Sequence, residues 1–561
     1  MKSPAQTLLR GALALSLGAL ACTDDGGGAE AADAATETND EGSCTPGTQG
    51  CECVESWCFG ELICDAGVCV PPPDEEGSST DAEGSEDETS SEDSSDSTDS
   101  TDSADSTDEE SSSGAESEGS EDSSDSEDTG EPLTPCEVAA ASRASIGCEY
   151  VMPILGMGNS SDQCEIAVVN PTPDAVATAY VEGYVDGAWE PLAAPFVLEP
   201  YDSDALLVSI SPFRALRVSS DAPVAVLESL GLRNNEFYKD ASVGMSGTLL
   251  HASAAWGTRY FGLGSIGTGH FRSAPQLIIL SLEPDTELSM VAPADMEAFH
   301  SVQGTTAVAA FGAYETTLGP ADTLRLRPED FTTSFAETEI VSSKPIAVFS
   351  YAADGRYPVD GDQGDGMYDQ LLPTDAWGTE HMAVPVDGIY SNLDYNTWLI
   401  VASEPNTTVS FEGVSAPPIV LAAEGDSARV GDPSWTEAFR IVSDAPVGVM
   451  QFLDGGQAPS MTSVPPVAHL ADRGGHFAHS GPDVYNVWMT RGRPSGEVAV
   501  AINGGALDVF STYEAQGWTF DTSVPSWGAF ALTHDGPFIS NAWVTVDAGH
   551  SALFGSAYQI D

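Results

Sequence analysis

The chain has 561 residues, of which 88 are acidic and 18 are basic, so its formal net charge at pH 7 is −70. A charge of this size disfavours nucleic acid and anionic lipid head groups as partners, because both repel an acidic surface. The same charge keeps a protein soluble outside the cell.

The N-terminus has the layout of a secretory signal. Lys2 and Arg10 precede an apolar run at 11–21, and the run stops at Cys22. This run is far shorter than the roughly 20 residues of a membrane-spanning helix, and the sequence has no other uncharged apolar stretch of that length. We therefore expect residues 1–21 to be a signal peptide and the protein to be exported.

The signal ends in Ala19-Leu-Ala-Cys22, which resembles the bacterial lipobox. In a lipobox a signal peptidase cleaves before a cysteine that carries diacylglycerol, and Leu is preferred one place earlier than Leu20 stands here. The resemblance implies lipidation of Cys22 and a location in the bacterial cell envelope, as an outer-membrane or cell-surface lipoprotein that touches the membrane through its anchor only. A plain secretory signal with cleavage near Ala21 is the alternative.

A low-complexity stalk at 22–43 leads into a cysteine-rich segment at 44–70. Cysteines of an exported chain are expected to form disulfides, because the compartment is oxidising. So short a segment is stable only when it is stapled, which predicts a small disulfide module of open connectivity; a zinc site is the alternative. Its cysteines are Cys44, Cys51, Cys53, Cys58, Cys64 and Cys69.

The cysteine count is odd once Cys22 is set aside, because the chain has ten cysteines. One of Cys136, Cys148 and Cys164 is therefore expected to be free or paired between molecules.

Residues 71–131 consist almost wholly of Ser, Asp, Glu, Thr and Gly. Such a tract cannot bury enough apolar surface to offset its chain entropy, so we expect a disordered linker. Its charges repel one another and extend it, which suits a spacer that lifts the following domain off the membrane. Unspecific binding of calcium is the alternative role.

The segment 132–561 has ordinary globular composition and a fourfold repeat of strand patterns. Each copy has an apolar strand, an X-Pro turn and a further strand, which alternates clearly in the last two copies, as half-buried strands do. The four turns are Asn170-Pro171, Glu283-Pro284, Glu404-Pro405 and Arg493-Pro494.

A second signature follows later in each copy. Its clear examples are Ser219-Ser-Asp-Ala-Pro223, Ser342-Ser-Lys-Pro345 and Ser443-Asp-Ala-Pro446, and the fourth is degenerate, at 535–537 or at 546–549. Ser and Asp favour tight turns, and Pro is tolerated where a strand begins. The pattern predicts a turn that joins two core strands.

These patterns predict an all-β fold. The repeat divides it into four antiparallel units near 147–255, 256–376, 377–473 and 474–561. Units of about 100 residues suit a sandwich-like array, and closure into a propeller-like body is the alternative.

Part of this region resembles a known family. Ser342-Ser-Lys-Pro-Ile-Ala-Val-Phe-Ser350, Asp369-Gln-Leu-Leu-Pro-Thr-Asp-Ala-Trp-Gly378 with Met382-Ala-Val-Pro385, and Asn406-Thr-Thr-Val409 are similar to the N-terminal domain of the IgG Fc-binding protein family. The family usually has Cys-Asp-His just before its Glu-Gln-Leu, whereas this chain has Asp365-Gly-Met-Tyr368, so a disulfide is missing. The resemblance implies a surface recognition or matrix module rather than immunoglobulin as the ligand, and it carries over no contact residue.

Two motifs partly match known cofactor-binding or metal-binding patterns. Gly262-Leu-Gly-Ser-Ile-Gly267 satisfies the dinucleotide-binding pattern, but the residues after it do not favour the required helix, so we interpret it as a glycine-rich loop. His476 and His479 with Asp472 and Asp483 carry metal-ligating atoms, but their spacing lacks the single face of a helix. We interpret these histidines as packing or surface residues.

The best metal candidate is the acidic loop that contains Asp360, Asp362 and Asp365. Three carboxylates on a glycine-rich loop could gather around Ca²⁺, which prefers six to eight oxygen ligands. The spacing is not that of an EF-hand, and a solvated acidic loop is the alternative. We expect no other cofactor.

Three functions remain for the whole chain. The anchor, the spacer and the repeat favour a non-catalytic adhesion or ligand-binding module whose partner is an extracellular protein or glycan. A secreted polysaccharide hydrolase that uses two carboxylates leaves no sequence signature, and a structural envelope protein is the third possibility.

Overall fold

The computed structural model describes residues 63–65, 68–70, 132–155, 163–209, 213–230, 246–264, 275–328, 335–355, 365–386, 395–454, 459–478, 486–497, 499–505, 509, 511–523, 528–547 and 550–560. No helix within these ranges is long and apolar enough to cross a membrane. Contacts divide the chain into two compact units, Met1–Ser123 and Ser124–Asp561.

The first unit contributes one described hairpin. It consists of β1 (Ile63–Asp65) and β2 (Val68–Val70), and Cys64 lies opposite Cys69 in its register. The predicted signal peptide, Cys22, the other four cysteines of the module and the linker 71–131 lie outside the described residues.

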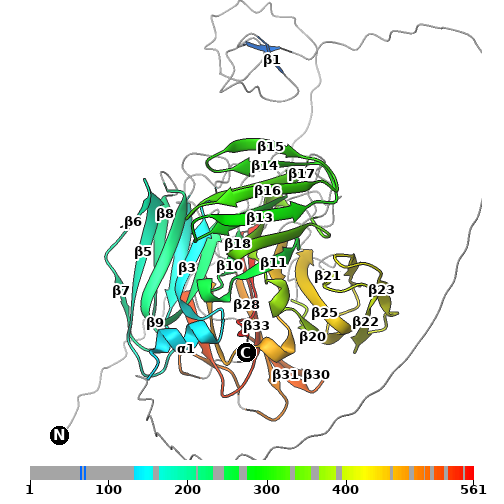
Figure 1. The fold of residues 1–561 in the computed structure, drawn as a ribbon. Helices are drawn as coiled ribbons and strands as arrows, with labels where there is room; N and C mark the ends of the chain where they lie inside the picture. Colours follow the sequence, from blue (N-terminus) through cyan, green and yellow to red (C-terminus); the bar gives the residue numbers. More distant parts are fainter. Residues whose placement is uncertain are drawn as a thin grey trace, which may run out of the picture. The chain divides into compact units, whose positions relative to one another are not determined.

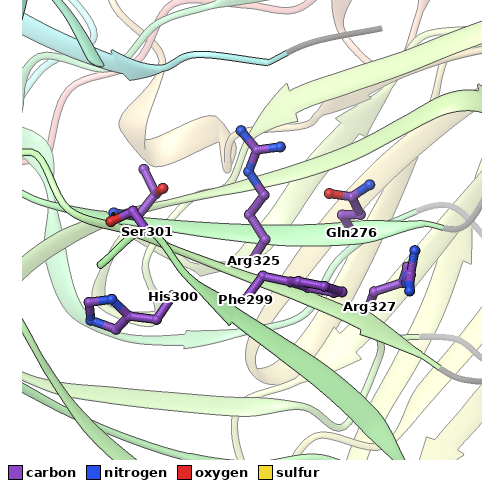
Figure 2. A pocket seen from close by; sticks show the side chains of 7 residues that line it. Gln276, Phe299, His300, Ser301, Arg325 and Arg327 are labelled. Carbon is purple, nitrogen blue, oxygen red and sulfur yellow. Dashed lines mark hydrogen bonds between the residues drawn. The ribbon is translucent and has the colours of Figure 1, made fainter. Parts of the chain in front are cut away.

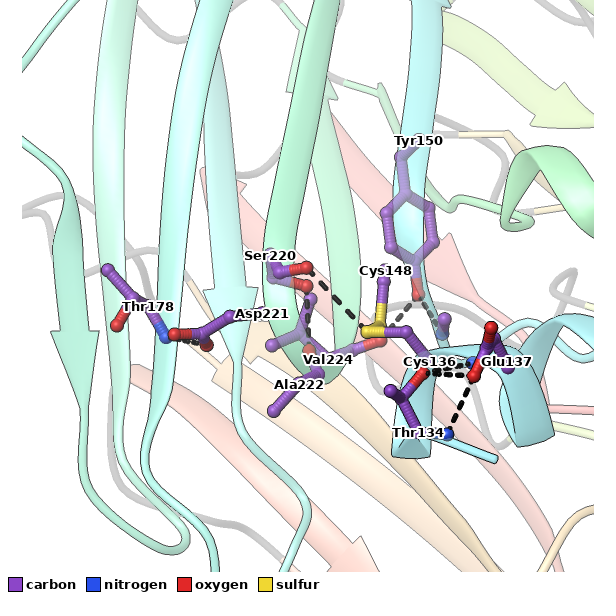
Figure 3. Close-up of a disulfide and its surroundings, with 11 residues drawn as sticks. Thr134, Cys136, Glu137, Cys148, Tyr150, Thr178, Ser220, Asp221, Ala222 and Val224 are labelled. Carbon is purple, nitrogen blue, oxygen red and sulfur yellow. Dashed lines mark hydrogen bonds between the residues drawn. A yellow bond between two sulfur atoms is a disulfide. The ribbon is translucent and has the colours of Figure 1, made fainter. Parts of the chain in front are cut away.

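The second unit contains a helix whose N-terminal end is fixed by a capping box and a disulfide. In α1 (Pro135–Ala141) the side chain of Thr134 accepts from the backbone of Glu137, and Glu137 reaches back to the backbone N–H of Thr134, which is a capping box. A disulfide from Cys136 to Cys148 ties the helix to the first strand of the sheet structure, with 5.7 Å between the Cα atoms (Figure 3). Cys164 is free and buried, as the odd cysteine count predicted.

The rest of this unit is antiparallel β-structure in four repeats, which confirms the all-β prediction (Figure 1). Repeat 1 contains β3 (Gly147–Pro153), β4 (Gln163–Val169), β5 (Ala177–Val185), β6 (Ala188–Pro191), β7 (Phe196–Leu198), β8 (Ser203–Ser209), β9 (Ala215–Leu230) and β10 (Ser246–Leu249). Repeat 2 contains β11 (Gly257–Phe261), β12 (Gln276–Ser281), β13 (Thr286–Val291), β14 (Met296–His300), β15 (Gly304–Val308), β16 (Ala313–Leu318), β17 (Thr323–Pro328), β18 (Glu339–Gly355) and β19 (Asp365–Gln370).

The later repeats follow the same plan. Repeat 3 contains β20 (Gly378–Ala383), β21 (Tyr395–Ala402), β22 (Thr407–Glu412), β23 (Ile419–Leu421), β24 (Ser427–Val430), β25 (Phe439–Asp454) and β26 (Ser460–Ser463). Repeat 4 contains β27 (Arg473–Ala478), β28 (Asn486–Pro494), β29 (Ala501–Ile502), β30 (Ser511–Ala515), β31 (Trp518–Ser523), β32 (Gly528–Thr533), β33 (Ile539–Asp547) and β34 (His550–Phe554). Short 3-10 helices, η1 (Ser253–Ala255), η3 (Thr374–Ala376) and η4 (Val467–His469), connect one repeat to the next.

Repeats 1, 2 and 3 are each organised around a long strand whose two halves pair with different strands. The first half of β9 pairs with β3 and β5, and its second half pairs with β10 and β4. The strands β18 and β25 do the same with their own neighbours. In repeat 4 the two halves are separate strands, because β32 pairs with β27 and β29 whereas β33 pairs with β28 and β34.

The Ser-Asp-Ala-Pro signature marks the bend of these long strands. In the three clear copies, the hydroxyl group of Ser220, Ser342 or Ser443 donates to the carbonyl two residues ahead at 2.7 Å. The next side chain, Asp221 in repeat 1 and Asp444 in repeat 3, accepts the backbone N–H of the second residue of the neighbouring strand, at 2.6 and 2.7 Å. Proline then costs no ladder hydrogen bond, because the long strand changes its partner strands at this point.

The predicted turn between two strands was therefore wrong for these three copies. The polar residues do bend the chain, but strands pair on both sides of the bend and keep β9, β18 and β25 continuous. The fourth copy is the Asp535-Gly536-Pro537 segment, since it separates β32 from β33.

The four repeats close into a ring. Their innermost strands meet in the order β10, β19, β26 and β34, and β34 returns to β10. The apolar strands explain this closure, because they are buried on both faces: Ile278 and Leu280 of β12 pack into the core of repeat 1, whereas Leu277 and Ile279 pack into the core of repeat 2. Repeat 4 packs its core against Ala167 and Val169 of repeat 1 in the same way. Of the two predicted arrangements, the structure has the closed one.

Glycines at the start of repeats 1, 2 and 3 make the close contacts between repeats possible. Gly378 starts β20, and a Cβ atom on it would lie 2.4 Å from Cβ of Pro466, which is closer than real Cβ atoms approach. The glycines that begin β3 and β11 meet Ala252 and Pro373 at 2.5 and 2.4 Å in the same way. The Trp-Gly pair that was noted in the sequence is thus a packing element of the ring.

Residues 556–560 complete the ring by joining repeat 4 to the start of repeat 1. The backbone N–H of Ser145 donates to Tyr558 O at 2.8 Å, and the N–H of Ile560 donates to Ser142 O at 3.0 Å. The ring of Tyr558 also packs edge-on against His251, with 4.8 Å between centroids.

Candidate functional site

A buried polar cluster lies where three innermost strands meet. We call Thr248, Asp369, Gln370 and Ser463 the hub; they come from β10, β19 and β26. Asp369 accepts the hydroxyl of Thr248 at 2.8 Å and the backbone N–H of Ser463 at 2.7 Å. Burial raises the pKa of Asp369 to about 6, although both hydrogen bonds favour its carboxylate.

The hub explains one of the sequence motifs. Asp369 and Gln370 belong to the segment that carries the family resemblance, and the Gln370 side chain accepts the backbone N–H of His251 at 2.8 Å. One carboxylate and one amide thereby connect repeats 1, 2 and 3. The hub is a structural element, because its members are buried and directed at one another.

A second buried acid lies beside the hub. The hydroxyl of Tyr368 donates to Oε2 of Glu228 at 2.7 Å, whereas Oε1 of Glu228 is buried with no hydrogen-bond partner in the described part of the chain. Burial raises the pKa of Glu228 from 4.5 to about 8, against the lowering effect of the Tyr368 hydrogen bond. Burial also raises the pKa of the neighbouring thiol of Cys164, and the charge of Glu228 adds to that shift. Glu228 is therefore largely protonated at neutral pH.

A cleft of about 390 Å³ lies on the sheet of repeat 2, where β12, β14 and β17 pair (Figure 2). We call it the arginine cleft, and its lining residues are Gln276, Phe299, His300, Ser301, Thr323, Arg325 and Arg327. Arg325 pairs with Phe299 and Arg327 with Glu297 in the register of β14 and β17. Side chains alternate along a strand, so these four project from one face of the sheet.

Two of the cleft residues are held by the protein itself. Arg327 forms an ion pair with Glu297, and its guanidinium lies 5.0 Å from the centroid of the Phe299 ring. His300 accepts the backbone N–H groups of Val302 and Gln303 through Nδ1 at 3.0 and 3.2 Å, and its Nε2–H donates to Thr317 O at 3.2 Å. This histidine secures the turn between β14 and β15, and both of its ring nitrogens are occupied.

Arg325 differs from the other surface arginines. One of its nitrogens, Nη2, donates to the carbonyl of Ile154 at 2.6 Å, and it has no acidic partner among the described residues. Eight other arginines of the described part form ion pairs with Asp or Glu: Arg143, Arg214, Arg217, Arg259, Arg327, Arg440, Arg473 and Arg493. Burial lowers the pKa of Arg325. Its remaining donors face the cleft and can bind a planar acceptor.

Most of the candidate metal loop lies outside the described residues. Asp360 and Asp362 lie outside the described residues, and Asp365 is the first residue of β19, paired with Gly355. The described residues contain no group of three or more His, Cys, Asp or Glu side chains that could hold a metal ion. Calcium binding by this loop stays a prediction.

The other motifs of the sequence have packing roles where they are described. His476 is buried in β27, and burial lowers its pKa to about 3, while Asp472 pairs with the adjacent Arg473 at 2.9 Å. His479 and Asp483 lie outside the described residues. Gly262 follows β11, where a Cβ atom would lie 2.2 Å from Phe335 O, so this glycine serves close chain packing.

Sequence reasoning missed the arginine cleft. The only signal was the alternation Leu324-Arg-Leu-Arg327, which places two cations on one face of a strand in a chain of only 18 basic residues. The partners from β12 and β14 become neighbours only through long-range pairing, which the alternation does not specify.

Comparison with known protein families gives a match to much of the ring. A family model described as IgGFc binding protein matches residues 246–544, which is more than half of the chain. The matched range begins at the first residue of β10 and ends within β33, and it contains the hub and the arginine cleft. No curated protein matches the chain.

Proposed function

Since the chain belongs to the IgG Fc-binding protein family, we propose that it is a bacterial surface protein whose β-ring is a non-catalytic recognition module for an extracellular ligand. The family match over 246–544 is the observation that carries this proposal. The match covers repeats 2 and 3 and most of repeat 4, and it excludes the acidic tract at 71–131, so in the proposal recognition belongs to the ring.

In the proposal, the N-terminal segment 1–131 displays the ring outside the cell. In the proposal, a lipid on Cys22 anchors the protein to the outer membrane or the cell surface, and the acidic linker at 71–131 holds the ring away from it. The net charge of −70 supports an extracellular protein or a sparsely charged glycan as the ligand, because polyanions are repelled.

The fold also supports recognition rather than catalysis. The buried acids Asp369 and Glu228 sit in the hub and beside it, each hydrogen-bonded inside the protein, and the arginine cleft has a positively charged side chain at its centre. A closed ring with a cleft on one of its sheets is a suitable scaffold for binding, because a preformed surface loses little entropy on association.

A binding panel tests this function. The purified full chain is immobilised and exposed to extracellular matrix proteins, to the Fc fragment of immunoglobulin G and to a glycan array, with the segment 22–131 as the control surface. We expect saturable binding of a protein to the full chain and none to the control. Cleavage of an arrayed polysaccharide by the full chain, or binding to the control segment alone, would contradict the proposal.

A further inference from the structure

The arginine cleft has the composition of an interface anchor. Arginine and aromatic residues are enriched among the residues that dominate binding energy, and here Arg325, Arg327 and Phe299 share one sheet face. The side chain of Gln276 also lines the cleft, at the start of β12. Figure 2 shows Arg325 projecting from the sheet between the side chains of Ser301 and Gln276.

An exposed apolar side chain lies next to the cleft. Val302 follows the lining residue Ser301 in the turn between β14 and β15 and is 60% exposed. An apolar residue beside a charged centre excludes water when a partner covers it, which strengthens the central contact. A free sugar acid would leave Val302 uncovered, whereas a folded protein covers it.

We propose that the arginine cleft receives an aspartate or glutamate side chain of the extracellular protein partner, with the free donors of the Arg325 guanidinium on the carboxylate and Gln276 beside it. The inference rests on the proposed function and names the chemistry of its ligand. The carboxylate fits because a guanidinium presents parallel N–H groups to its two oxygens. Arg327 is already paired with Glu297, so Arg325 carries the recognition.

The charge of the whole chain further restricts the chemical class of the partner. The chain carries 88 acidic and 18 basic residues, so its overall charge repels a polyanion. A single carboxylate in an otherwise neutral or basic surface is repelled less and meets the guanidinium of Arg325 at close range. The partner is therefore a protein with an isolated acidic residue rather than an acidic polymer.

Small probes test the inference without the natural partner. Ligand-observed saturation-transfer NMR on the full chain uses N-acetyl-glutamate amide, its neutral analogue N-acetyl-glutamine amide, and glucuronate as a sugar acid. We expect the glutamate probe to bind and Arg325→Gln to weaken its affinity about tenfold, as the loss of one charge-assisted contact does. The control Arg473→Gln removes an exposed arginine outside the cleft and should leave binding unchanged.

Two milder variants keep the test decisive if Arg325→Gln disturbs the contact with Ile154. Arg325→Lys retains the charge but not the fork, and Gln276→Ala removes a side chain at the cleft edge; each should weaken the glutamate probe severalfold while the thermal transition stays at its wild-type temperature. Equal binding of the glutamate and glutamine probes, or no effect of any cleft variant, overturns the inference. Binding of glucuronate alone would replace the protein partner by an acidic glycan, and would also overturn it.

The probe experiment and the binding panel test separate claims, so a negative result in one does not imply a negative result in the other. If the panel finds no partner but the glutamate probe binds in an Arg325-dependent way, the cleft chemistry holds and the choice of panel proteins was wrong. If the panel finds a partner that Arg325→Gln binds as well as the parent does, the recognition function holds and the cleft is not its anchor.

Discussion

The stability of the Glu228→Gln variant relative to the parent should increase as the pH rises. Burial raises the pKa of Glu228 from 4.5 to about 8, so the folded protein holds a proton that the unfolded chain has lost. The stability that this group contributes is fully present below pH 4.5 and is lost as the pH rises through 8. Glutamine keeps the size of the side chain, can accept the Tyr368 hydroxyl and has no proton to lose.

The magnitude follows from the shift. One pKa unit corresponds to about 1.4 kcal/mol, so between pH 5 and pH 8 the cost of Glu228 grows by about 3 kcal/mol in the parent and not in the variant. The difference between the two proteins isolates this group. This comparison is needed because other buried groups also make the stability depend on pH. His251 and His476 are buried with a pKa lowered to about 3, so the protein loses the stability they contribute as the pH falls below 6.5, which opposes the effect of Glu228.

Urea denaturation followed by tryptophan fluorescence at pH 5 and pH 8 measures the effect. Glu190→Gln is the matched control, because Glu190 is exposed on β6 and should show no pH-dependent difference from the parent. A Glu228→Gln advantage that is equal at the two pH values would refute the reasoning, since it would mean that Glu228 is ionised in the folded protein throughout.

The remaining predictions concern the anchor, the linker, the metal loop and the ring. Metabolic labelling with a palmitate analogue should mark the parent and not Cys22→Ser; equal labelling of both would exclude the anchor. Deleting 71–131 should shift the thermal transition of the ring by no more than about 1 °C, because the tract has no apolar surface to bury, and a large loss would show that it packs. At matched ionic strength, about 10 mM Ca²⁺ should stabilise the parent by about 1 kcal/mol more than Mg²⁺ does, and not Asp360→Asn/Asp362→Asn, if a millimolar site exists; a double variant that responds like the parent would argue against it. Gly378→Ala should destabilise the ring by about 1 to 3 kcal/mol in urea denaturation through overpacking, whereas an unchanged midpoint would show that the contact relaxes freely.

Local patterns predicted the strands well because the cause of each pattern is local. Alternation along 407–412 reports one buried face of β22, and the X-Pro pairs at 170–171, 283–284 and 404–405 fall between strands because proline interrupts pairing. The arginine of the fourth pair, Arg493, lies inside β28, whose last residue is Pro494.

The bends and the cleft were harder to predict because their causes are distant. The residues Ser443 and Asp444 have the composition of a turn, and only the pairing of β25 with strands on both sides keeps the chain extended there. Arg325 likewise becomes distinctive only in three dimensions, where it lacks an acidic neighbour in the described part of a very acidic chain. Lipidation of Cys22 and calcium at Asp360 and Asp362 concern residues outside the structure's description, and they stay predictions.

The contact between Ser145 and Tyr558 has a consequence for the order of folding. These residues are 413 positions apart, and the hydroxyl of Ser145 donates to Tyr558 O at 3.2 Å. Loop-closure entropy makes this contact about 3 kcal/mol less favourable than closure of a ~12-residue loop, so it forms only when the other repeats have already shortened the loop. Until repeat 4 has been synthesised, Ala167 and Val169 of β4 have no core of that repeat to cover them. A nascent chain therefore keeps one apolar edge open until repeat 4 has emerged, so the ring closes only after almost the whole chain has been synthesised.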